Sequence, residues 1–179
     1  MLEDSQKKEF EDKLTKYLRP LPEKDLRRVW AEKVGLFNGD AMLYCEEKWT
    51  DNSTLQLDAR GMSDGTLRFI AIIVALLTGV PQSLLIIEEV DNGLHPSRSE
   101  ELVKVLRELG NERSIDILCT THNPALIDAL GHKMMPFISY VKRDAETGTS
   151  IIALLEDKEN LAKLMAGHTI GDMMTNDLI

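Results

Sequence analysis

The stretch SLLIIEEVDNGLHP, residues 83–96, decides the fold. Its four aliphatic residues run directly into Glu88 and Glu89, and a polar turn ending at Pro96 follows. A short, unbroken apolar run bounded by a turn is typical of a buried strand in a parallel sheet. Ligands bind at the carboxyl ends of such strands, and adjacent strand residues point to opposite faces. We therefore expect the two glutamates to serve different surfaces of one ligand-binding edge.

Strand and helix patterns alternate after residue 83. The periodicity predicts a strand over 83–88, a helix over 97–109, a strand over 115–120 and a helix over 124–130. This β-α-β-α order, with unbroken apolar strands, predicts a parallel sheet that helices cover on both faces. The tail adds three predicted elements, namely strands within 136–143 and 150–157 and a closing helix near 158–165.

The N-terminal part shows two other patterns. Residues 4–34 carry apolar residues at helical spacing, which predicts two amphipathic helices separated by a break at Arg19 to Pro22. Residues 41–49 and 53–59 have strand-like patterning. Because the turn-forming stretch Thr50-Asp51-Asn52 lies between them, they are predicted to form a β-hairpin.

A buried helix is predicted between the hairpin and the acidic strand. Residues 66–77 are apolar nearly all round, and Gly79 is placed to end the helix. We therefore expect an α/β fold, in which a largely parallel sheet is flanked by helices, with N-terminal helices and a β-hairpin added. The chain is predicted to be one domain, made of a helical segment (1–38), a β-hairpin (39–60) and a core (61–179).

Composition limits the partners. The chain has 179 residues, 43% of them hydrophobic, which is enough for one domain with a core. Its net charge is −9, from 30 acidic and 21 basic residues, so a broad electrostatic contact with nucleic acid or an anionic membrane is disfavoured.

Cysteine usage and hydropathy predict a cytoplasmic location. Cys45 and Cys119 have no Cys or His at metal-ligand spacing, and both are predicted to be buried free thiols in a reducing compartment. The longest apolar run, Phe69 to Leu77, is too short to span a bilayer. The opening residues MLEDSQKKEF carry no apolar stretch of the kind that a secretion signal needs.

Two further motifs accompany the acidic strand. Upstream, MSDGTLR (62–68) places a serine, an aspartate and a glycine before the long helix. A hydroxyl and free backbone N–H groups at a helix start suit a phosphate. Downstream, CTTHNPALIDAL (119–130) puts His122 directly after the next strand, at the same predicted edge. A lone glutamate or histidine at such a position is commonly structural, but the three motifs together favour a nucleotide site.

The three motifs resemble the C-terminal half of an ABC-type ATPase head. The resemblance covers roughly residues 55–130 and lies with the branch that includes RecF-like, SMC-like and OLD-like ATPases and the AAA-family ATPases of bacterial anti-phage systems. The common wording there is close to LSDGTLR, IEEPENGLHP and THSPELIDAL. This chain differs at three positions, where it has Val90 instead of proline, Asp91 instead of glutamate and Asn123 instead of serine. None of these differences removes a charge that the chemistry needs.

The resemblance implies a P-loop NTPase-like fold, ATP and Mg²⁺ as ligands, and a role for each matching residue. Glu88 would hold Mg²⁺, Glu89 would be the catalytic base, and His122 would be the switch histidine that senses the γ-phosphate. Nucleotide contacts are implied for the signature motif and the D-loop, which correspond here to Ser63, Asp64 and Gly65 and to Asp91 to His95, Asn92 included. Arg68 is a secondary candidate for a phosphate contact, since an arginine at a helix start is commonly a surface ion-pair former.

The phosphate loop of such ATPases is missing. No G-x-x-x-x-G-K-[ST] occurs in the 179 residues, so the main cradle for the β- and γ-phosphates is absent. The chain is therefore predicted to need a Walker A loop from a partner chain or from an N-terminal region, within a head-to-tail dimer. Contact with nucleic acid would run through partners, and none with a membrane is expected.

Other readings stay open. The chain can be a non-catalytic dimerisation scaffold descended from such ATPases, or a metal-dependent nuclease that uses Glu88, Glu89 and Asp91. Heads of this kind serve DNA repair and anti-phage defence, and the sequence does not choose between these processes.

Overall fold

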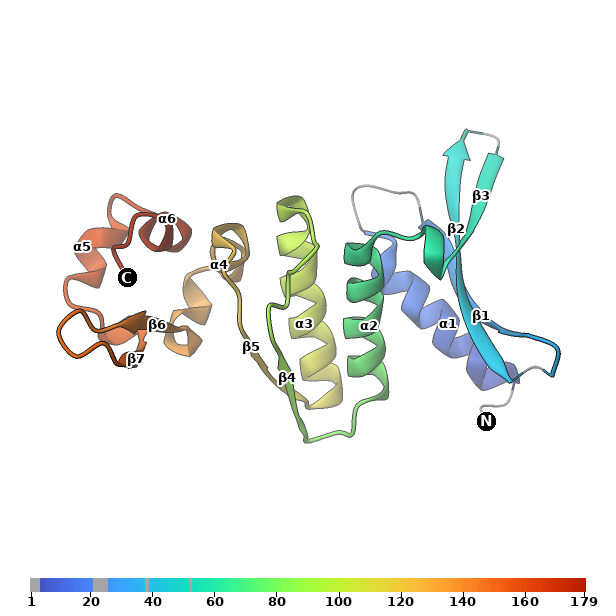
Figure 1. The fold of residues 1–179 in the computed structure, drawn as a ribbon, viewed down its shortest axis with the longest axis horizontal. Coiled ribbons are helices and arrows are strands. Elements are labelled where there is room, and N and C mark those ends of the chain that lie inside the picture. The colour runs from blue at the N-terminus through green and yellow to red at the C-terminus, as the bar shows by residue number, and fades with distance from the viewer. Residues whose placement is uncertain (1–3, 21–25, 38, 52) are drawn as a thin grey trace. The chain divides into compact units, whose positions relative to one another are not determined.

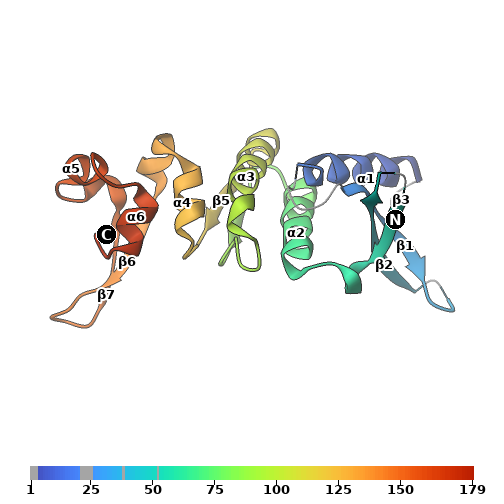
Figure 2. The same cartoon turned by 90° about the horizontal axis from the view of Figure 1, so that it is seen from above.

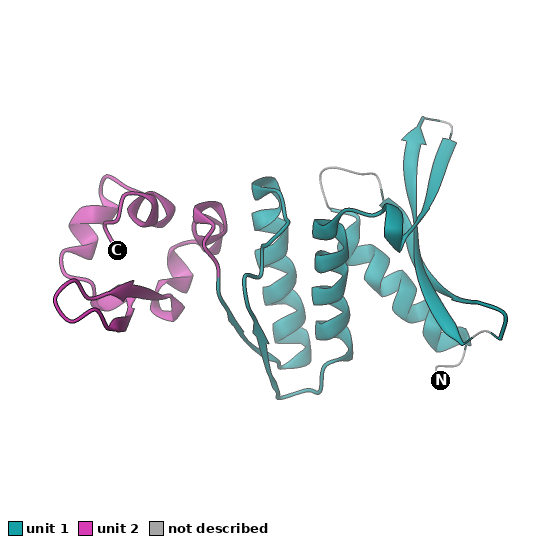
Figure 3. Ribbon diagram, viewed as in Figure 1, with its two compact units in different colours: residues 1–120 teal, residues 121–179 magenta. Residues whose placement is uncertain are grey.

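The computed structural model describes residues 4–20, 26–37, 39–51 and 53–179, and the chain divides into two units (Figure 3). Unit 1 spans residues 1–120 and unit 2 spans residues 121–179. Both combine helices and strands, so the predicted α/β class is confirmed. The strands of the described residues form two antiparallel sheets and one parallel pair, rather than one largely parallel sheet. That residues 1–179 form one domain stays a prediction.

Unit 1 begins with a helix and an antiparallel sheet (Figures 1 and 2). The helix is α1 (Asp4–Leu18), and the sheet has the strand order β1 (Leu26–Val34), β2 (Asp40–Thr50), β3 (Ser53–Asp58). The predicted hairpin of β2 and β3 is confirmed. The predicted second helix is wrong, because its residues form β1, which pairs with β2.

The helix-like spacing in β1 comes from a bulge and from its packing on α1. The register shifts between Leu26 and Arg28, so the buried residues of β1 do not alternate. The backbone N–H of Val29 donates to Thr15 Oγ1 at 3.0 Å. The backbone N–H of Ala31 donates to the Glu11 carboxylate, also on α1, at 2.9 Å. Parts of the predicted break and of the predicted turn, at residues 21–22 and 52, lie outside the described residues.

The second part of unit 1 carries the motifs. Two helices, α2 (Asp64–Thr78) and α3 (Ser99–Arg113), lie side by side (Figure 1). They are connected through β4 (Leu84–Ile87), and β5 (Asp116–Cys119) follows α3 and pairs with β4 in parallel. These elements confirm the predicted order. Buried side chains of both helices, including Phe69, Ile73, Leu102 and Leu109, form much of the core.

The β4–β5 sheet has one covered face and one exposed face. On the covered face, Ile117 packs against α3 so closely that its side chain would lie 3.1 Å from a Cβ placed on Gly110. On the other face, Leu84, Ile86 and Leu118 are 58%, 62% and 56% exposed. The predicted cover of helices is thus seen on one face only within the described part of unit 1. Cys119 is also exposed, which corrects the prediction of two buried thiols, whereas Cys45 is buried as predicted.

Unit 2 has its own small core. Its elements are α4 (Pro124–Leu130), the antiparallel pair β6 (Ser139–Arg143) and β7 (Ser150–Leu154), α5 (Leu161–Met165) and α6 (Ile170–Thr175). All but α6 match predicted elements. The core centres on Leu155, Ile170 and Met173. Across both units, the described residues include no helix that is long and apolar enough to cross a membrane.

The α1–β1 contact gives a stability prediction. The buried hydroxyl of Thr15 donates to the Glu11 carbonyl and accepts from the Val29 N–H, so Thr15→Ala leaves a buried N–H without its acceptor. We expect a loss of about 1–3 kcal/mol in the free energy of unfolding, measured by urea denaturation. Thr78→Ala removes an exposed hydroxyl from the end of α2 and is the matched control, with a change within about 0.5 kcal/mol. Equal losses in both variants would show that the buried bond is not special.

Candidate functional site

The first turn of α2 carries the signature-like residues. Ser63 caps the helix, since its Oγ accepts the Thr66 N–H at 3.2 Å and lies 2.8 Å from Thr66 Oγ1. Ser63 and Asp64 are exposed, whereas Gly65 is buried. The exposed start therefore presents a hydroxyl and the positive end of a helix of 15 residues.

Gly65 sits against the turn that follows β4. A Cβ on Gly65 would lie 2.2 Å from the carbonyl oxygen of Gly93, which is far inside contact distance and involves rigid backbone. Gly93 itself has a φ of +75°, a conformation that glycine adopts without strain. Only glycine at position 65 lets the helix start approach this turn so closely.

The turn that holds the acids has a strained backbone. Glu89 has a φ of +45°, which for a residue with a side chain costs roughly 1–2 kcal/mol. Thr120, directly after β5, supports it from one side. The Glu89 N–H donates to Thr120 Oγ1 at 2.9 Å, and the Val90 N–H donates to the Thr120 carbonyl oxygen at 3.0 Å. The Val90 side chain is fully buried and anchors the turn.

Arg68 holds the same turn from the other side. Its Nη2 donates to the carbonyl oxygens of Glu88 and Glu89, both at 2.6 Å, and its Nε approaches the Val90 carbonyl oxygen at 3.4 Å. Because Arg68 lies one helical turn after Gly65, the start of α2 contacts the acidic turn twice. The structure thus brings Gly65 and Arg68 against the backbone of the acidic turn, whereas Ser63 is exposed.

The carboxylates of this turn face solvent. Glu88 and Glu89 are exposed, and Asn92 Nδ2 donates to Glu89 Oε2 at 3.2 Å. Burial raises the pKa of the neighbouring Cys119 thiol, although the residue is partly accessible, and the Asp91 carboxylate raises it further. The thiol therefore stays protonated at neutral pH, which is unfavourable for a nucleophile or metal ligand.

Mg²⁺ fits this edge only together with a phosphate ligand. In proteins Mg²⁺ keeps several waters and takes one or two carboxylates plus substrate phosphates, so the exposed Glu88 at the strand end is a suitable ligand. Within the described residues no three His, Cys, Asp or Glu side chains form a group that holds a metal by themselves.

The two candidate histidines differ. His95 caps the short 3-10 helix Pro96–Arg98, since its Nδ1 accepts the Ser97 N–H at 3.2 Å. His122 belongs to unit 2 and is exposed, and the next residue, Asn123, caps α4 by accepting the Ala125 N–H. The local structure leaves the His122 ring accessible, and its role as γ-phosphate sensor stays a prediction.

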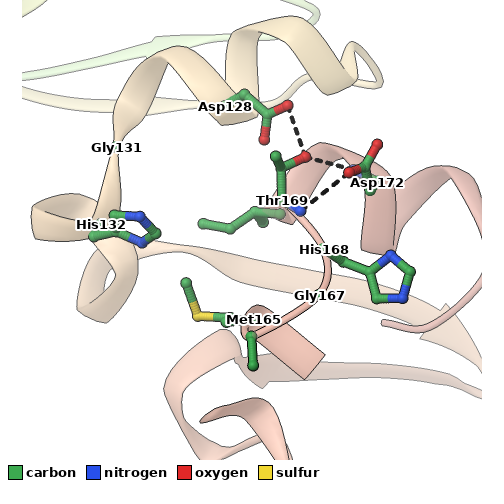
Figure 4. A pocket seen from close by; sticks show the side chains of 10 residues that line it. Asp128, Gly131, His132, Met165, Gly167, His168, Thr169 and Asp172 are labelled. Carbon is green, nitrogen blue, oxygen red and sulfur yellow. Dashed lines mark hydrogen bonds between the residues drawn. The ribbon is translucent and has the colours of Figure 1, made fainter. Parts of the chain in front are cut away.

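Unit 2 contains a separate hollow of about 440 Å³ between α4 and the start of α6 (Figure 4). Two of its acids have structural partners. Asp128 accepts the Thr169 hydroxyl and the Gly171 N–H, and Asp172 closes a capping box with Thr169. The carboxylates here hold the start of α6 in place.

Sequence reasoning missed two residues of the site in unit 1. Thr120 was read only as the end of a strand, although its hydroxyl and its carbonyl both accept N–H groups of the acidic turn. Gly93 was read as part of a motif, without its partner Gly65. The signal for Thr120 is its position, because a polar residue that ends the neighbouring strand is placed to meet the turn after β4.

Comparison with protein families finds a match over the motif region. Residues 46–128 match the family model described as "AAA domain, putative AbiEii toxin, Type IV TA system", which is somewhat less than half of the chain. The comparison with curated proteins finds no match.

Solved structures share the fold at low sequence identity. One comes from work on "ATP-driven dimerization and DNA stimulated activation of SMC ATPases", with a TM-score of 0.57, 11% identity, and cover of 89% of this chain and 92% of that chain. Two others are Smc head domains from Pyrococcus yayanosii and Pyrococcus furiosus, with TM-scores of 0.51 and 0.50, identities of 14% and 12%, and cover of 87% of this chain. The chain spans 28% and 37% of those two chains.

The fold is that of SMC ATPase heads. Together with the AAA-domain match, it supports a relationship to the ABC- and AAA-type ATPases.

The Gly65 contact is open to a direct test. Gly65→Ala should normally favour a helix by about 1 kcal/mol, but its methyl group would meet the Gly93 carbonyl. We expect a net loss of about 1–3 kcal/mol in the free energy of unfolding, with NMR shifts at Gly93 and Leu94. Gly61→Ala is the matched control, since its Cβ would lie 3.4 Å from a movable Leu57 side chain. A Gly65→Ala variant as stable as the unaltered chain would contradict the close approach.

Proposed function

We propose that this chain is the part of an ABC-type ATPase that supplies the signature motif, the Walker B acids and the switch histidine. A Walker A loop, carried by another chain or by an N-terminal region, would complete it. The observation that carries the proposal is the contact between the signature-like helix start and the acidic turn, at Gly65 and Gly93. The AAA-domain match spans the same region.

In the proposed assembly two heads meet head to tail around ATP. The phosphate loop of one head would hold the nucleotide from one side, and the exposed Ser63 would contact it from the other, whereas Gly65, for which a nucleotide contact was also predicted, is buried. The exposed start of α2 suits this role, because helix N-termini bind phosphates through N–H groups and the helix dipole. ATP-driven dimerization is named for one structural relative, and we propose that this chain takes part in a similar dimerization.

The proposed reaction is the hydrolysis of ATP to ADP and phosphate. Glu89 would orient the attacking water in line with the γ-phosphate and take its proton, and Asn92 holds one oxygen of its carboxylate. His122 would donate to the γ-phosphate. Glu88 would hold Mg²⁺, which would neutralise charge on the phosphate oxygens.

The exposed face of the β4–β5 sheet supports the proposal that another part of the ATPase packs against it. Leu84, Ile86 and Leu118 are all more than half exposed on strands of a parallel pair, and such strands are normally buried on both faces. The occupant that we propose is the half with the phosphate loop, because no G-x-x-x-x-G-K-[ST] occurs in the 179 residues. The net charge of −9 disfavours a broad DNA contact by this chain, so we propose that any such contact runs through the partner. Anti-phage defence or DNA repair would then be the process that the cycle drives.

The catalytic role of Glu89 gives a prediction. The chain alone should release no phosphate from ATP with Mg²⁺, whereas the chain co-purified with the phosphate-loop half should turn over. In that assembly Glu89→Gln should lower kcat by about 10²- to 10⁴-fold and leave ATP binding intact, because only the proton acceptor is lost. Phosphate release and nucleotide binding are the measurements.

Glu108→Gln, an exposed change on α3, is the matched control and should keep full turnover. A non-catalytic scaffold predicts equal turnover for Glu89→Gln and the control. Robust turnover by the chain alone would also contradict the proposal.

The exposed sheet face gives a second prediction. Ile86→Lys should leave the isolated chain folded, since that side chain is 62% exposed, but should place an unpaired charge in the interface. We expect loss of co-elution with the phosphate-loop half and of ATP hydrolysis. Val80→Lys, 72% exposed in the loop before β4, is the control and should keep both. Full assembly by Ile86→Lys would show that the partner half lies elsewhere.

A further inference from the structure

Three consecutive backbone carbonyls share one guanidinium. Arg68 on α2 donates to the carbonyl oxygens of Glu88 and Glu89 at 2.6 Å each, and its Nε lies 3.4 Å from that of Val90. No carboxylate takes part in these contacts. The guanidinium therefore binds backbone carbonyl groups at the strand end and not the side chains of the acids.

The backbone at this point needs outside support. Glu89 has a φ of +45°, and a non-glycine residue in this region persists only when its surroundings fix it. Thr120 accepts the N–H groups of Glu89 and Val90, and Arg68 donates to the carbonyl groups. The turn is thus fixed through its donors by β5 and through its acceptors by α2.

The direction of the Glu89 side chain depends on this backbone. A change of φ from the left-handed region to the common helical or extended region would turn the Cα–Cβ bond away from its present direction. The carboxylate, now within 3.2 Å of Asn92 Nδ2, would move with it. A general base that is misplaced by about 1 Å loses on the order of 10²-fold in rate.

We propose that Arg68 is a positioning residue for Glu89, which couples the start of α2 to the acidic turn. The proposal rests on the ATPase function proposed above and deepens it. Arg68 follows Gly65 by three residues, so both face the turn from the same side of α2. A displacement of the helix start by nucleotide at Ser63 would pass through Arg68 to the backbone of Glu89.

The chemistry requires an arginine. Its planar fork presents several N–H donors at fixed angles, so one group can serve neighbouring carbonyls at once. A lysine ammonium is a compact charge on a flexible stem and holds this geometry poorly. Arg68→Lys therefore keeps the charge but is expected to lose the positioning, which separates geometry from electrostatics.

The first test uses the isolated chain and needs no nucleotide. Amide hydrogen exchange at Glu89 and Val90, followed by NMR, should be faster by about tenfold or more in Arg68→Met and Arg68→Lys, because hydrogen bonds to a charged donor are lost. Arg107→Met, an exposed change on α3, is the control and should leave both rates unchanged. Circular dichroism confirms that each variant folds. Unchanged exchange in the Arg68 variants would overturn the proposal.

The second test uses the assembly with the phosphate-loop half. Arg68→Lys should lower kcat by about tenfold or more with KM for ATP within about twofold, because the base and not the nucleotide is displaced. In a Glu89→Gln background the same change should cause no further loss. A raised KM with unchanged kcat would assign Arg68 to a phosphate contact instead, and equal losses in both backgrounds would assign it a general structural role; either result overturns the proposal.

The two tests separate the two proposals. If the unaltered assembly does not hydrolyse ATP, the proposed function fails. The exchange rates of the isolated chain still decide whether Arg68 holds the turn.

Discussion

The close approach of the Gly65 position to the Gly93 carbonyl is the constraint on which the candidate site depends. It exists because position 65 has no side chain, and it sets the distance between α2 and the turn after β4. Arg68 then reaches the carbonyls of that turn one helical turn later. The start of α2 therefore contacts the acidic turn at two points, Gly65 and Arg68. Under the proposed function, a ligand that displaces the helix start would displace the acidic turn as well.

The motif region was predictable because its signals are local. Apolar runs with sharp ends at Gly79 and Pro96 gave the order of elements from α2 to α4, and the strand-end rule placed Glu88 and Glu89 at one edge. The sequence does not show which residues of different elements contact one another. Arg68 reads as a candidate for phosphate, but which carbonyls it meets depends on how α2 packs.

The wrong predictions came from hydrophobic patterns whose meaning depends on tertiary packing. In β1 a bulge follows Leu26, and Val29 and Trp30 are both buried although they lie on opposite faces of the strand, so the spacing of buried residues mimics a helix. The exposed face of the β4–β5 sheet was unpredictable for the opposite reason, since its residues are as apolar as those of a covered face. Periodicity reports which residues prefer burial. It does not report whether the covering element is part of the same chain.

The exposed sheet face and the lack of a phosphate loop in the 179 residues are the two observations behind the proposed partner half, and the energy of covering that face bears on how the half would bind. Leu84, Ile86 and Leu118 are already partly buried, so covering them contributes only about 1 kcal/mol each. That sum is well short of the roughly 8 kcal/mol of a micromolar complex. If a partner half binds there, strand pairing at the open edges of β4 and β5 or nucleotide held between the halves must supply the rest. If strand pairing supplies it, the two halves stay together without ATP; if nucleotide supplies it, their assembly depends on the triphosphate.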